Sequence, residues 1–280
     1  MKRVTVIGGG TMGIGIAYVA AQAGGEVTVV EPGNERAEAM MRTVADAAQG
    51  AVSRGKLSAS GASELIGRIR RVASTSDVPL REDVIIESVP EDKALKLKVL
   101  TAAAARSPRL LASNTSALSI DRLATAVADP TIFLGMHFFN PVWSLKLVEI
   151  VRGGATAEAA VDEAREIGRW MGKETLVVLD IPGFATSRLD LIASLEAIRM
   201  LESGVASAED IDRAATLAYR HPVGPLRLSD IVGLDVRLDV ARALERAHGS
   251  RYAAPPLLER MVSEGRLGQK SGQGFFSWPS

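Results

Sequence analysis

Residues 4–13 read V-T-V-I-G-G-G-T-M-G, a short apolar run that passes directly into a glycine-rich turn. The run is rich in β-branched residues, which is typical of a buried strand in a parallel sheet. Residues 14–23 predict a helix of small residues, and residues 27–30 predict a second strand that ends at Glu31. This strand–helix–strand order, with G-x-G-x-x-G at the first turn and an acid after the second strand, is typical of a dinucleotide-binding domain.

Each glycine of the turn has its own expected role. Gly8 allows the tight turn, and Gly10 lets a pyrophosphate approach the backbone at the N-terminus of the helix. Gly13 lets the helix pack closely against the first strand. Thr11 and Met12 lie between these glycines, so we expect them to contact the cofactor as well.

Glu31 distinguishes between the two nicotinamide cofactors. Its carboxylate can accept hydrogen bonds from the adenosine ribose hydroxyls and would repel a 2′-phosphate, so the sequence favours NAD over NADP. A glycine-rich turn in some other α/β protein is the alternative interpretation. That alternative does not explain why the strand, the helix and the acid follow one another in this order and at this spacing.

Residues 34–70 have a helical pattern rich in alanine, arginine and glutamate. Three glycines are expected to break this segment into pieces: Gly50, Gly55 and Gly61. Arg54 and Lys56 lie near one of these breaks, where they could contact phosphate groups of a substrate. The alternative is that they belong to a solvated helix face.

Strands and helices alternate further along the chain, and then the strands cease. More strands are expected at residues 70–73, 84–89, 110–112, 132–136, 146–151 and 174–179. Only helices are expected in the last third, at residues 185–202, 226–231, 235–247, 256–264 and from 207 onward, where Ser207-x-x-Asp210 resembles a capping box at the start of a helix. The predicted fold class is therefore α/β, with a Rossmann-like, doubly wound, mostly parallel sheet at residues 1–182 and an all-helical domain at residues 183–280.

The composition is that of an ordinary globular protein, with 47% apolar and 24% charged residues among 280. The formal net charge is zero, so we expect no nucleic-acid partner. The chain has no cysteine, which excludes disulfides within it, and we expect no metal site. No apolar run reaches the roughly 18 residues of a membrane span, and no targeting segment is apparent, so we expect a cytoplasmic protein without a membrane partner.

Polar side chains gather at the edges of the later apolar runs. S-N-T-S occupies residues 113–116, His137 and Asn140 belong to H-F-F-N-P, and Glu149 lies in the run after that. A histidine, with a pKa of about 6.5, suits a general base that removes a hydroxyl proton near neutral pH. A carboxylate on its other ring nitrogen would fix the tautomer and stabilise the protonated ring. The pattern therefore indicates a catalytic site built around His137 and Glu149.

Glu91 and Lys96 follow the strand expected at residues 84–89. A turn in this position lies near the nicotinamide half of a bound dinucleotide, so both are candidate cofactor contacts. The alternative is that they are polar surface residues.

Taken together, these motifs resemble the L-3-hydroxyacyl-CoA dehydrogenase family, and within it the short bacterial 3-hydroxybutyryl-CoA dehydrogenase type. The resemblance covers nearly the whole chain. It is carried by I-G-G-G-T-M-G-I-G-I-A, S-N-T-S, H-F-F-N-P, K-L-V-E-I, P-G-F, A-E-D-I-D, V-G-P-L-R-L-S-D-I-V-G-L-D and G-Q-K-S-G-Q-G-F-F. It implies reversible oxidation of a 3-hydroxyacyl-CoA thioester to the 3-ketoacyl-CoA with NAD⁺, by a homodimer that associates through the helical domain.

The resemblance also implies roles for individual residues. His137 corresponds to the general base, Glu149 to its carboxylate partner, and Ser116 to the contact with the substrate hydroxyl. Asn140 corresponds to a residue near both cofactor and substrate. Ser187 departs from the pattern, because the family has an asparagine at this place in P-G-F-x-x-N-R, where it helps to hold the substrate.

Two alternatives remain open at this point. The same scaffold could act on a free hydroxy acid, as in the gulonate and carnitine dehydrogenases that look similar. It could also serve as a non-catalytic NAD-binding sensor or structural protein. The presence of S-N-T-S with H-F-F-N-P favours CoA esters, and the intact His137 and Glu149 favour an enzyme.

Overall fold

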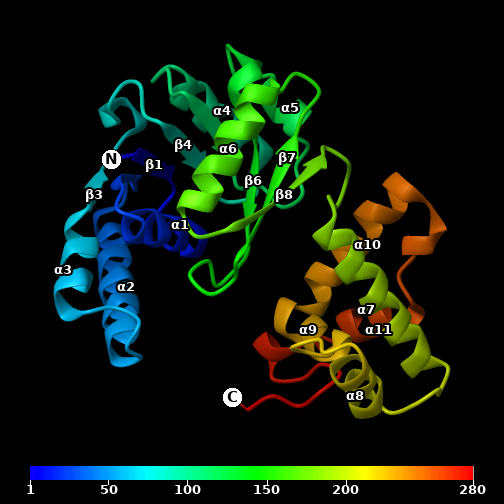
Figure 1. Ribbon diagram of the computed structural model, residues 1–280. Helices are drawn as coiled ribbons and strands as arrows, with labels where there is room; N and C mark the ends of the chain where they lie inside the picture. The colour runs from blue at the N-terminus through cyan, green and yellow to red at the C-terminus, as the bar shows by residue number, and fades with distance from the viewer. Residues whose placement is uncertain (280) are drawn as a thin grey trace. The chain divides into compact units, whose positions relative to one another are not determined.

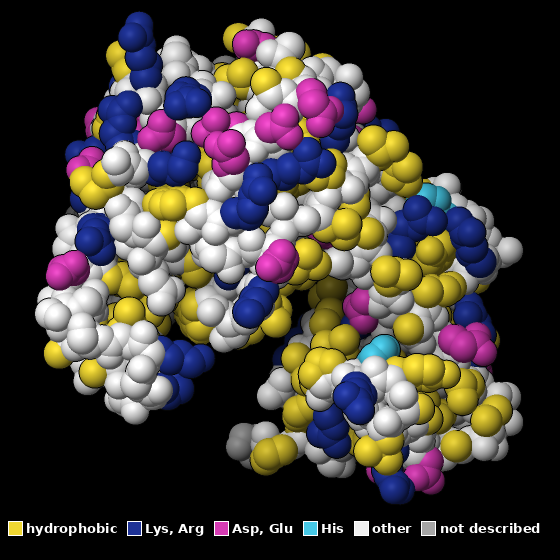
Figure 2. All heavy atoms as spheres, viewed as in Figure 1, with side chains coloured by type: hydrophobic (Ala, Val, Ile, Leu, Met, Phe, Trp, Pro, Cys, Tyr) yellow, Lys and Arg dark blue, Asp and Glu magenta, His cyan; other side chains and the backbone are white. Residues whose placement is uncertain are grey.

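The computed structural model describes residues 1–279, which divide into two compact units between Ile181 and Pro182. The first unit contains the sheet and the second is built of helices (Figure 1). Acidic and basic side chains are interspersed over the visible face of the first unit (Figure 2), in keeping with a formal net charge of zero. Within residues 1–279, no helix is both long enough and apolar enough to cross a membrane.

The strands of the first unit form one eight-stranded sheet in the order β3-β2-β1-β4-β5-β6-β7-β8. Neighbouring strands run parallel except β6 and β7, which pair antiparallel. The strands are β1 (Arg3–Ile7), β2 (Glu26–Val30), β3 (Ile69–Val72), β4 (Val84–Glu87), β5 (Leu110–Ser113), β6 (Phe133–Phe138), β7 (Leu147–Arg152) and β8 (Glu174–Leu179). The predicted Rossmann-like, mostly parallel sheet is confirmed.

Apolar side chains of the central strands form the core of this unit. Val4, Val6 and Ile86 are fully buried and belong to one cluster with residues of α1 and α6. The α4 helix contacts β4, and α5 contacts β6. The helices of this unit are α1 (Thr11–Gln22), α2 (Asn34–Ser53), α3 (Ala59–Gly67), α4 (Lys93–Ala104), α5 (Ile120–Ala124) and α6 (Glu158–Trp170), with short 3₁₀ turns at Thr75–Asp77 and Pro130–Ile132.

The segment between β2 and β3 differs from the expectation that three glycines would break it. The chain leaves the helical path once, between α2 and α3, where Gly55 has a φ of +67°. Gly50 lies inside α2, and Gly61 lies in the first turn of α3, where its amide donates to the Ser58 hydroxyl (3.0 Å). The prediction was therefore wrong for Gly50 and Gly61, because α2 buries an apolar face and α3 has a hydroxyl cap that offset the low helix propensity of glycine.

Apolar side chains of the helices form a separate core in the second unit. Leu191, Leu195 and Ile198 of α7 are fully buried in it, whereas Leu189 is 70% exposed. Ser207 caps α8 by accepting a hydrogen bond from the Asp210 amide (3.1 Å), as the sequence predicted. The helices are α7 (Thr186–Glu202), α8 (Ala208–Ala218), α9 (Pro225–Val232), α10 (Leu234–His248) and α11 (Pro256–Ser263), with 3₁₀ turns at Ser250–Tyr252 and Gln269–Ser271.

The antiparallel pair β6–β7 determines where the central histidine lies. The sequence placed His137 after the end of its strand, but β6 continues to Phe138 and includes it. The backbone of His137 pairs directly with that of Glu149 on β7. Residues opposite one another in an antiparallel pair project to the same face of the sheet, so the strand register itself brings the two side chains together.

Candidate active site

A cavity of about 1180 Å³ lies at the carboxyl ends of the parallel strands in the first unit. Its wall includes seven of the predicted site residues that the sequence assigned to cofactor or substrate: Gly8, Gly10, Met12, Glu31, Glu91, Ser116 and Asn140. His137 also lines this cavity, whereas Thr11, Gly13 and Lys96 do not. Strand ends at such an edge are the usual ligand-binding position in an open α/β sheet.

The glycine-rich turn shapes one end of the cavity. Gly8 adopts a φ of +112°, and its amide donates to the Val30 carbonyl (3.0 Å), which closes the turn against β2. A Cβ atom at Gly13 would lie 1.9 Å from the Gly8 carbonyl oxygen, so no larger residue fits there. A Cβ at Gly10 would meet nothing within 4 Å. Because glycine has no side chain, the space beside the first amides of α1 stays open. Those amides lack partners within the helix and suit a pyrophosphate.

Glu31 lies at the end of β2, only 2% exposed. Its Oε2 accepts a hydrogen bond from the Gly9 amide (3.3 Å) and pairs with Arg36 (3.2 Å), and its Oε1 accepts one from the Gly33 amide (3.1 Å). These contacts fix the carboxylate at the wall of the cavity, where it can meet the ribose of a dinucleotide. The cavity, the open backbone at Gly10 and this fixed acid together fit NAD.

His137 and Glu149 form a buried pair at the other end of the cavity. The Nδ1 atom of His137 lies 2.9 Å from Oε2 of Glu149, which is fully buried, while His137 is 7% exposed. The Phe139 ring lies against the imidazole, with ring centroids 4.4 Å apart. A carboxylate beside Nδ1 favours the tautomer in which Nδ1 carries the proton, which makes Nε2 the basic nitrogen.

The S-N-T-S loop is tied to the histidine strand through its asparagine. The Asn114 side-chain oxygen accepts a hydrogen bond from the Phe138 amide (2.9 Å), and its nitrogen donates to the Ser88 hydroxyl (3.3 Å). Asn114 therefore fixes the distance between β6 and the loop that carries Ser116. Sequence reasoning missed this role, since the bond joins residues 24 positions apart.

Glu91 holds the same loop from its other side. One carboxylate oxygen, Oε1, accepts hydrogen bonds from the Thr115 hydroxyl (2.5 Å) and from the amides of Ser116 and Ala117 (3.1 Å each). Burial alone would raise the pKa of the Glu91 carboxyl, but the Thr115 hydroxyl, the Lys96 charge and the Ala117 amide outweigh it and lower that pKa. Glu91 is therefore an ionised anchor for the Ser116 loop.

Lys96 connects Glu91 to a second, fully buried carboxylate. Its ammonium lies 2.7 Å from Glu87 and 3.3 Å from Glu91, and Lys96 is 1% exposed. Glu87 also accepts a hydrogen bond from the Ser113 hydroxyl (2.6 Å). Removing one member of such a buried pair costs about 3–5 kcal/mol, because the remaining charge is left unpaired. Sequence reasoning missed Glu87, although a glutamate ending an otherwise apolar strand is a recognisable signal.

The remaining predicted residues lie elsewhere. Arg54 and Lys56 follow α2 and line a separate hollow rather than the large cavity. Ser187 is a half-buried residue in the first turn of α7, in the second unit. Among residues 1–279, no three His, Asp or Glu side chains cluster as metal ligands would.

Comparison with known proteins identifies the family. The model of the 3-hydroxyacyl-CoA dehydrogenase NAD-binding domain matches residues 3–181, and the model of the C-terminal domain of the same family matches residues 183–278. The chain belongs to the 3-hydroxyacyl-CoA dehydrogenase family. The predicted enzyme class is thus confirmed as an NAD-dependent 3-hydroxyacyl-CoA dehydrogenase, and NAD is its cofactor.

Several members of this family are similar over their whole length. A 3-hydroxybutyryl-CoA dehydrogenase of Mycobacterium tuberculosis is 41% identical, with 99% of each chain covered. A probable 3-hydroxybutyryl-CoA dehydrogenase of Bacillus subtilis is 37% identical over 99% of this chain and 98% of its own. The crystal structure of (S)-3-hydroxybutyryl-CoA dehydrogenase PaaH1 from Ralstonia eutropha matches with a TM-score of 0.95 at 33% identity, covering 100% of both chains.

Proposed function

We propose that this dehydrogenase interconverts short-chain (S)-3-hydroxyacyl-CoA and 3-ketoacyl-CoA, with 3-hydroxybutyryl-CoA as its substrate. The relatives that carry this name support the chain length, since they match from end to end. The observation that carries the chemistry is the buried His137–Glu149 pair at the wall of the cavity that also contains Ser116.

His137 acts as the general base in this proposal. Its Nε2 accepts the proton of the substrate 3-hydroxyl, while the carbon-bound hydrogen leaves as a hydride with both bonding electrons. Bound NAD⁺ supplies the acceptor for that hydride. Glu149 stabilises the imidazolium that forms, because its buried carboxylate remains 2.9 Å from Nδ1. In the reverse direction, the same imidazolium returns the proton to the developing alkoxide.

Ser116 and Asn140 contact the reacting part of the substrate or the nicotinamide from the cavity wall. Glu91 accepts a hydrogen bond from the backbone amide of Ser116 and not from its hydroxyl, so Glu91 orients the Ser116 side chain through the backbone. Ser187 would contribute a further hydrogen bond to the substrate, in place of the asparagine that the family resemblance implies. Arg54 and Lys56 would contact phosphate groups of the CoA, since both are exposed cations at one hollow.

We also propose a homodimer that forms through the helical unit. Large apolar side chains on its surface support this, because burial against a second copy would remove them from water. The most exposed of them are Leu189 (70%), Val205 (63%), Leu217 (72%) and Tyr219 (76%). Sedimentation of the purified protein tests the dimer. A location in the cytoplasm stays a prediction.

A steady-state assay of purified enzyme with NADH tests the proposed reaction. Acetoacetyl-CoA should be reduced with loss of the NADH absorbance, faster than longer ketoacyl-CoA esters, and NADPH should serve poorly because of Glu31. The free acid acetoacetate is the matched control. A preference for the free acid would point to a hydroxy-acid dehydrogenase, and no turnover of any ketoacyl-CoA from four to ten carbons would overturn the proposal.

A further inference from the structure

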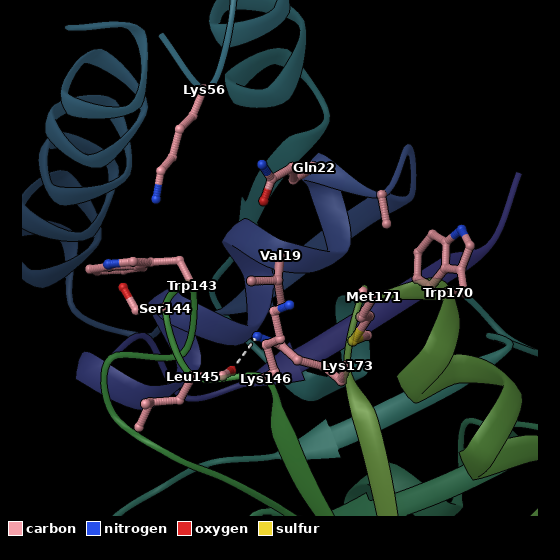
Figure 3. Close-up of a pocket in the computed structure, with 12 residues that line it drawn as sticks. Val19, Gln22, Lys56, Trp143, Ser144, Leu145, Lys146, Trp170, Met171 and Lys173 are labelled. Atoms are coloured by element: carbon pink, nitrogen blue, oxygen red, sulfur yellow. Dashed lines mark hydrogen bonds between the residues drawn. The ribbon is translucent and has the colours of Figure 1, made fainter. Parts of the chain in front are cut away.

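A basic side chain lies at the Glu31 end of the cofactor cavity. Arg36, in the first turn of α2, lines this end together with Glu31. Its Nη2 atom lies 3.2 Å from Oε2 of Glu31, and the Arg36 side chain is 70% exposed. By contrast, Lys56 and Lys146 lie around a separate hollow, whose described lining residues are all absent from the cavity wall (Figure 3). Arg36 is therefore a cation that a dinucleotide bound in the cavity can meet at its adenosine ribose.

The Glu31 carboxylate is occupied by donors from the chain itself. It accepts hydrogen bonds from the Gly33 and Gly9 amides and pairs with Arg36. Within residues 1–279, Glu31 and Arg36 are the two charged residues that line the cavity from β1 to the turn after β3. Opposite charges this close together largely cancel one another's field at a nearby group. The repulsion between Glu31 and a 2′-phosphate is therefore partly offset by Arg36.

Hydroxyl groups lie on the adjoining part of the wall. Strand β3 runs beside β2, and the Glu31 amide donates to the Val72 carbonyl (3.1 Å), so the chain leaves β3 next to Glu31. Ser74, Thr75 and Ser76 follow and line the cavity, and both serines are exposed. Hydroxyls can donate to phosphate oxygens, as a guanidinium does. This corner of the cavity thus offers a phosphate one cation and several neutral donors.

The turn that joins Glu31 to α2 is held from β3. Arg71 donates from Nε to the Glu31 carbonyl (2.7 Å) and from Nη2 to the Pro32 carbonyl (2.8 Å). The Ala37 amide donates to the Gly33 carbonyl (2.9 Å), which begins α2 immediately after the turn. Arg36 therefore projects from a fixed backbone. A ligand that recruits its guanidinium has to order one exposed side chain and no loop.

We propose that Arg36 is a specificity-determining residue for the cofactor, which offsets the repulsion between Glu31 and the 2′-phosphate of NADP(H) and binds that phosphate when the Glu31 charge is removed. A guanidinium presents its N–H donors in a planar fork that matches phosphate oxygens. NAD remains the preferred cofactor, because Glu31 is ionised and keeps Arg36 engaged. The kinetic test of this role rests on the proposed function, since it uses the reduction of a ketoacyl-CoA.

Reduction of acetoacetyl-CoA with NADH and with NADPH measures the cofactor preference. In Arg36→Gln, kcat/KM for NADPH should fall severalfold, through KM, while that for NADH stays within about twofold, because the unpaired Glu31 charge repels only the 2′-phosphate. Arg42→Gln makes the same charge change on the exposed face of α2, where Arg42 pairs with Glu38 (3.8 Å), and should leave both values unchanged. An unchanged ratio of the two kcat/KM values in Arg36→Gln overturns the proposal.

Glu31→Gln removes the opposing charge but keeps the size of the residue and one oxygen that can accept from a turn amide. Its kcat/KM for NADPH should rise about tenfold or more, since Arg36 is released to make a charge-assisted hydrogen bond to the 2′-phosphate. The double variant Glu31→Gln/Arg36→Gln should lose most of this gain. A gain that persists in full without Arg36 contradicts its role as the phosphate ligand.

Direct binding tests Arg36 independently of turnover. Adenosine 2′,5′-bisphosphate differs from adenosine 5′-monophosphate only in the 2′-phosphate, and titration calorimetry gives the dissociation constant of each. The affinity for the bisphosphate relative to the monophosphate should be highest in Glu31→Gln, intermediate in the wild type and lowest in Arg36→Gln, and NAD⁺ should displace both nucleotides.

The calorimetric result separates the role of Arg36 from the proposed reaction. A relative affinity that does not depend on Arg36, or bisphosphate binding that NAD⁺ does not displace, overturns the role of Arg36 and leaves the dehydrogenase intact. Absence of turnover with every ketoacyl-CoA refutes the proposed function, while the titration still decides whether Arg36 recognises a 2′-phosphate.

Discussion

The two ends of the cofactor cavity are built from different parts of the chain. At β1 and β2 the wall contains the backbone of Gly8 and Gly10, with Glu31 as its fixed acid, and Gly13 packs behind it against the Gly8 carbonyl. At β4 to β7 the wall residues Glu91 and His137 are held by hydrogen bonds to side chains that lie behind the wall. The first end should therefore respond to changes of volume, and the second to changes of charge and of proton position.

The largest effect is expected at the side-chain end, from His137→Gln. This change keeps the size of the residue but removes the base, so kcat should fall by a factor of about 10²–10⁴. Steady-state kinetics with acetoacetyl-CoA and NADH measure the loss, and the NADH dissociation constant serves as the control for an intact cavity. A kcat within a factor of about ten of wild type would show that another group removes the proton.

Glu149→Gln should have the next largest effect. A hydrogen bond to a charged group contributes about 1.5–3 kcal/mol, which corresponds to roughly a tenfold to hundredfold lower kcat when the imidazolium loses its carboxylate partner. The His137→Gln/Glu149→Gln double variant sharpens the result. Since both act on one proton transfer, the double variant should be little slower than His137→Gln alone, and fully multiplicative losses would contradict a shared role.

The backbone end should show a volume effect in a matched pair of glycine variants. Gly13→Ala places a Cβ 1.9 Å from the Gly8 carbonyl, so overpacking should lower the free energy of unfolding by about 1–3 kcal/mol or more. Gly10→Ala finds open space and should leave that free energy nearly unchanged while it raises the KM for NAD⁺. Denaturant unfolding and cofactor titration of both variants check this, and equal destabilisation of the two would be inconsistent with the geometry.

The smallest effect is expected from the pH dependence of the Ser116 loop. The folded-state pKa of Glu91 lies below its unfolded value, so its anchoring is present above the pKa of a free glutamate and is lost as the pH falls through the lowered value. Hydrogen exchange at the Ser116 and Ala117 amides should therefore stay slow in mild acid. In Glu91→Gln the two amides should exchange faster at neutral pH, and identical protection in both proteins would disprove the anchor.

Most of the fold followed from local patterns. The turn at residues 8–13, the apolar runs of the strands and the Ser207 cap each depend on residues that are close together in the sequence, and each was confirmed. The break expected at Gly50 was wrong, because the apolar face of α2 outweighs the propensity of one residue. The family and its cofactor also followed from the sequence, since they depend on motifs that are contiguous.

The support around the site could not be read from local patterns. Glu87 and Asn114 each bind partners at least nine positions away, and their position depends on which strands become neighbours. The pairing of His137 with Glu149 could be predicted from the sequence only in part. The motifs suggested it, but the contact arises from the antiparallel register of β6 and β7.

In the antiparallel pair β6–β7, the strands position His137 and Glu149, and most of the loop that joins the strands does not. His137 and Glu149 lie opposite one another on the ladder, and residues 139–146 connect the two strands, beginning with Phe139 and Asn140, which line the cofactor cavity. Exchange of residues 142–146 for a stretch of another length or composition would keep Phe139 and Asn140, and the ladder would still set the spacing of His137 and Glu149. This part of the loop is therefore a position at which the sequence can be redesigned without moving the pair.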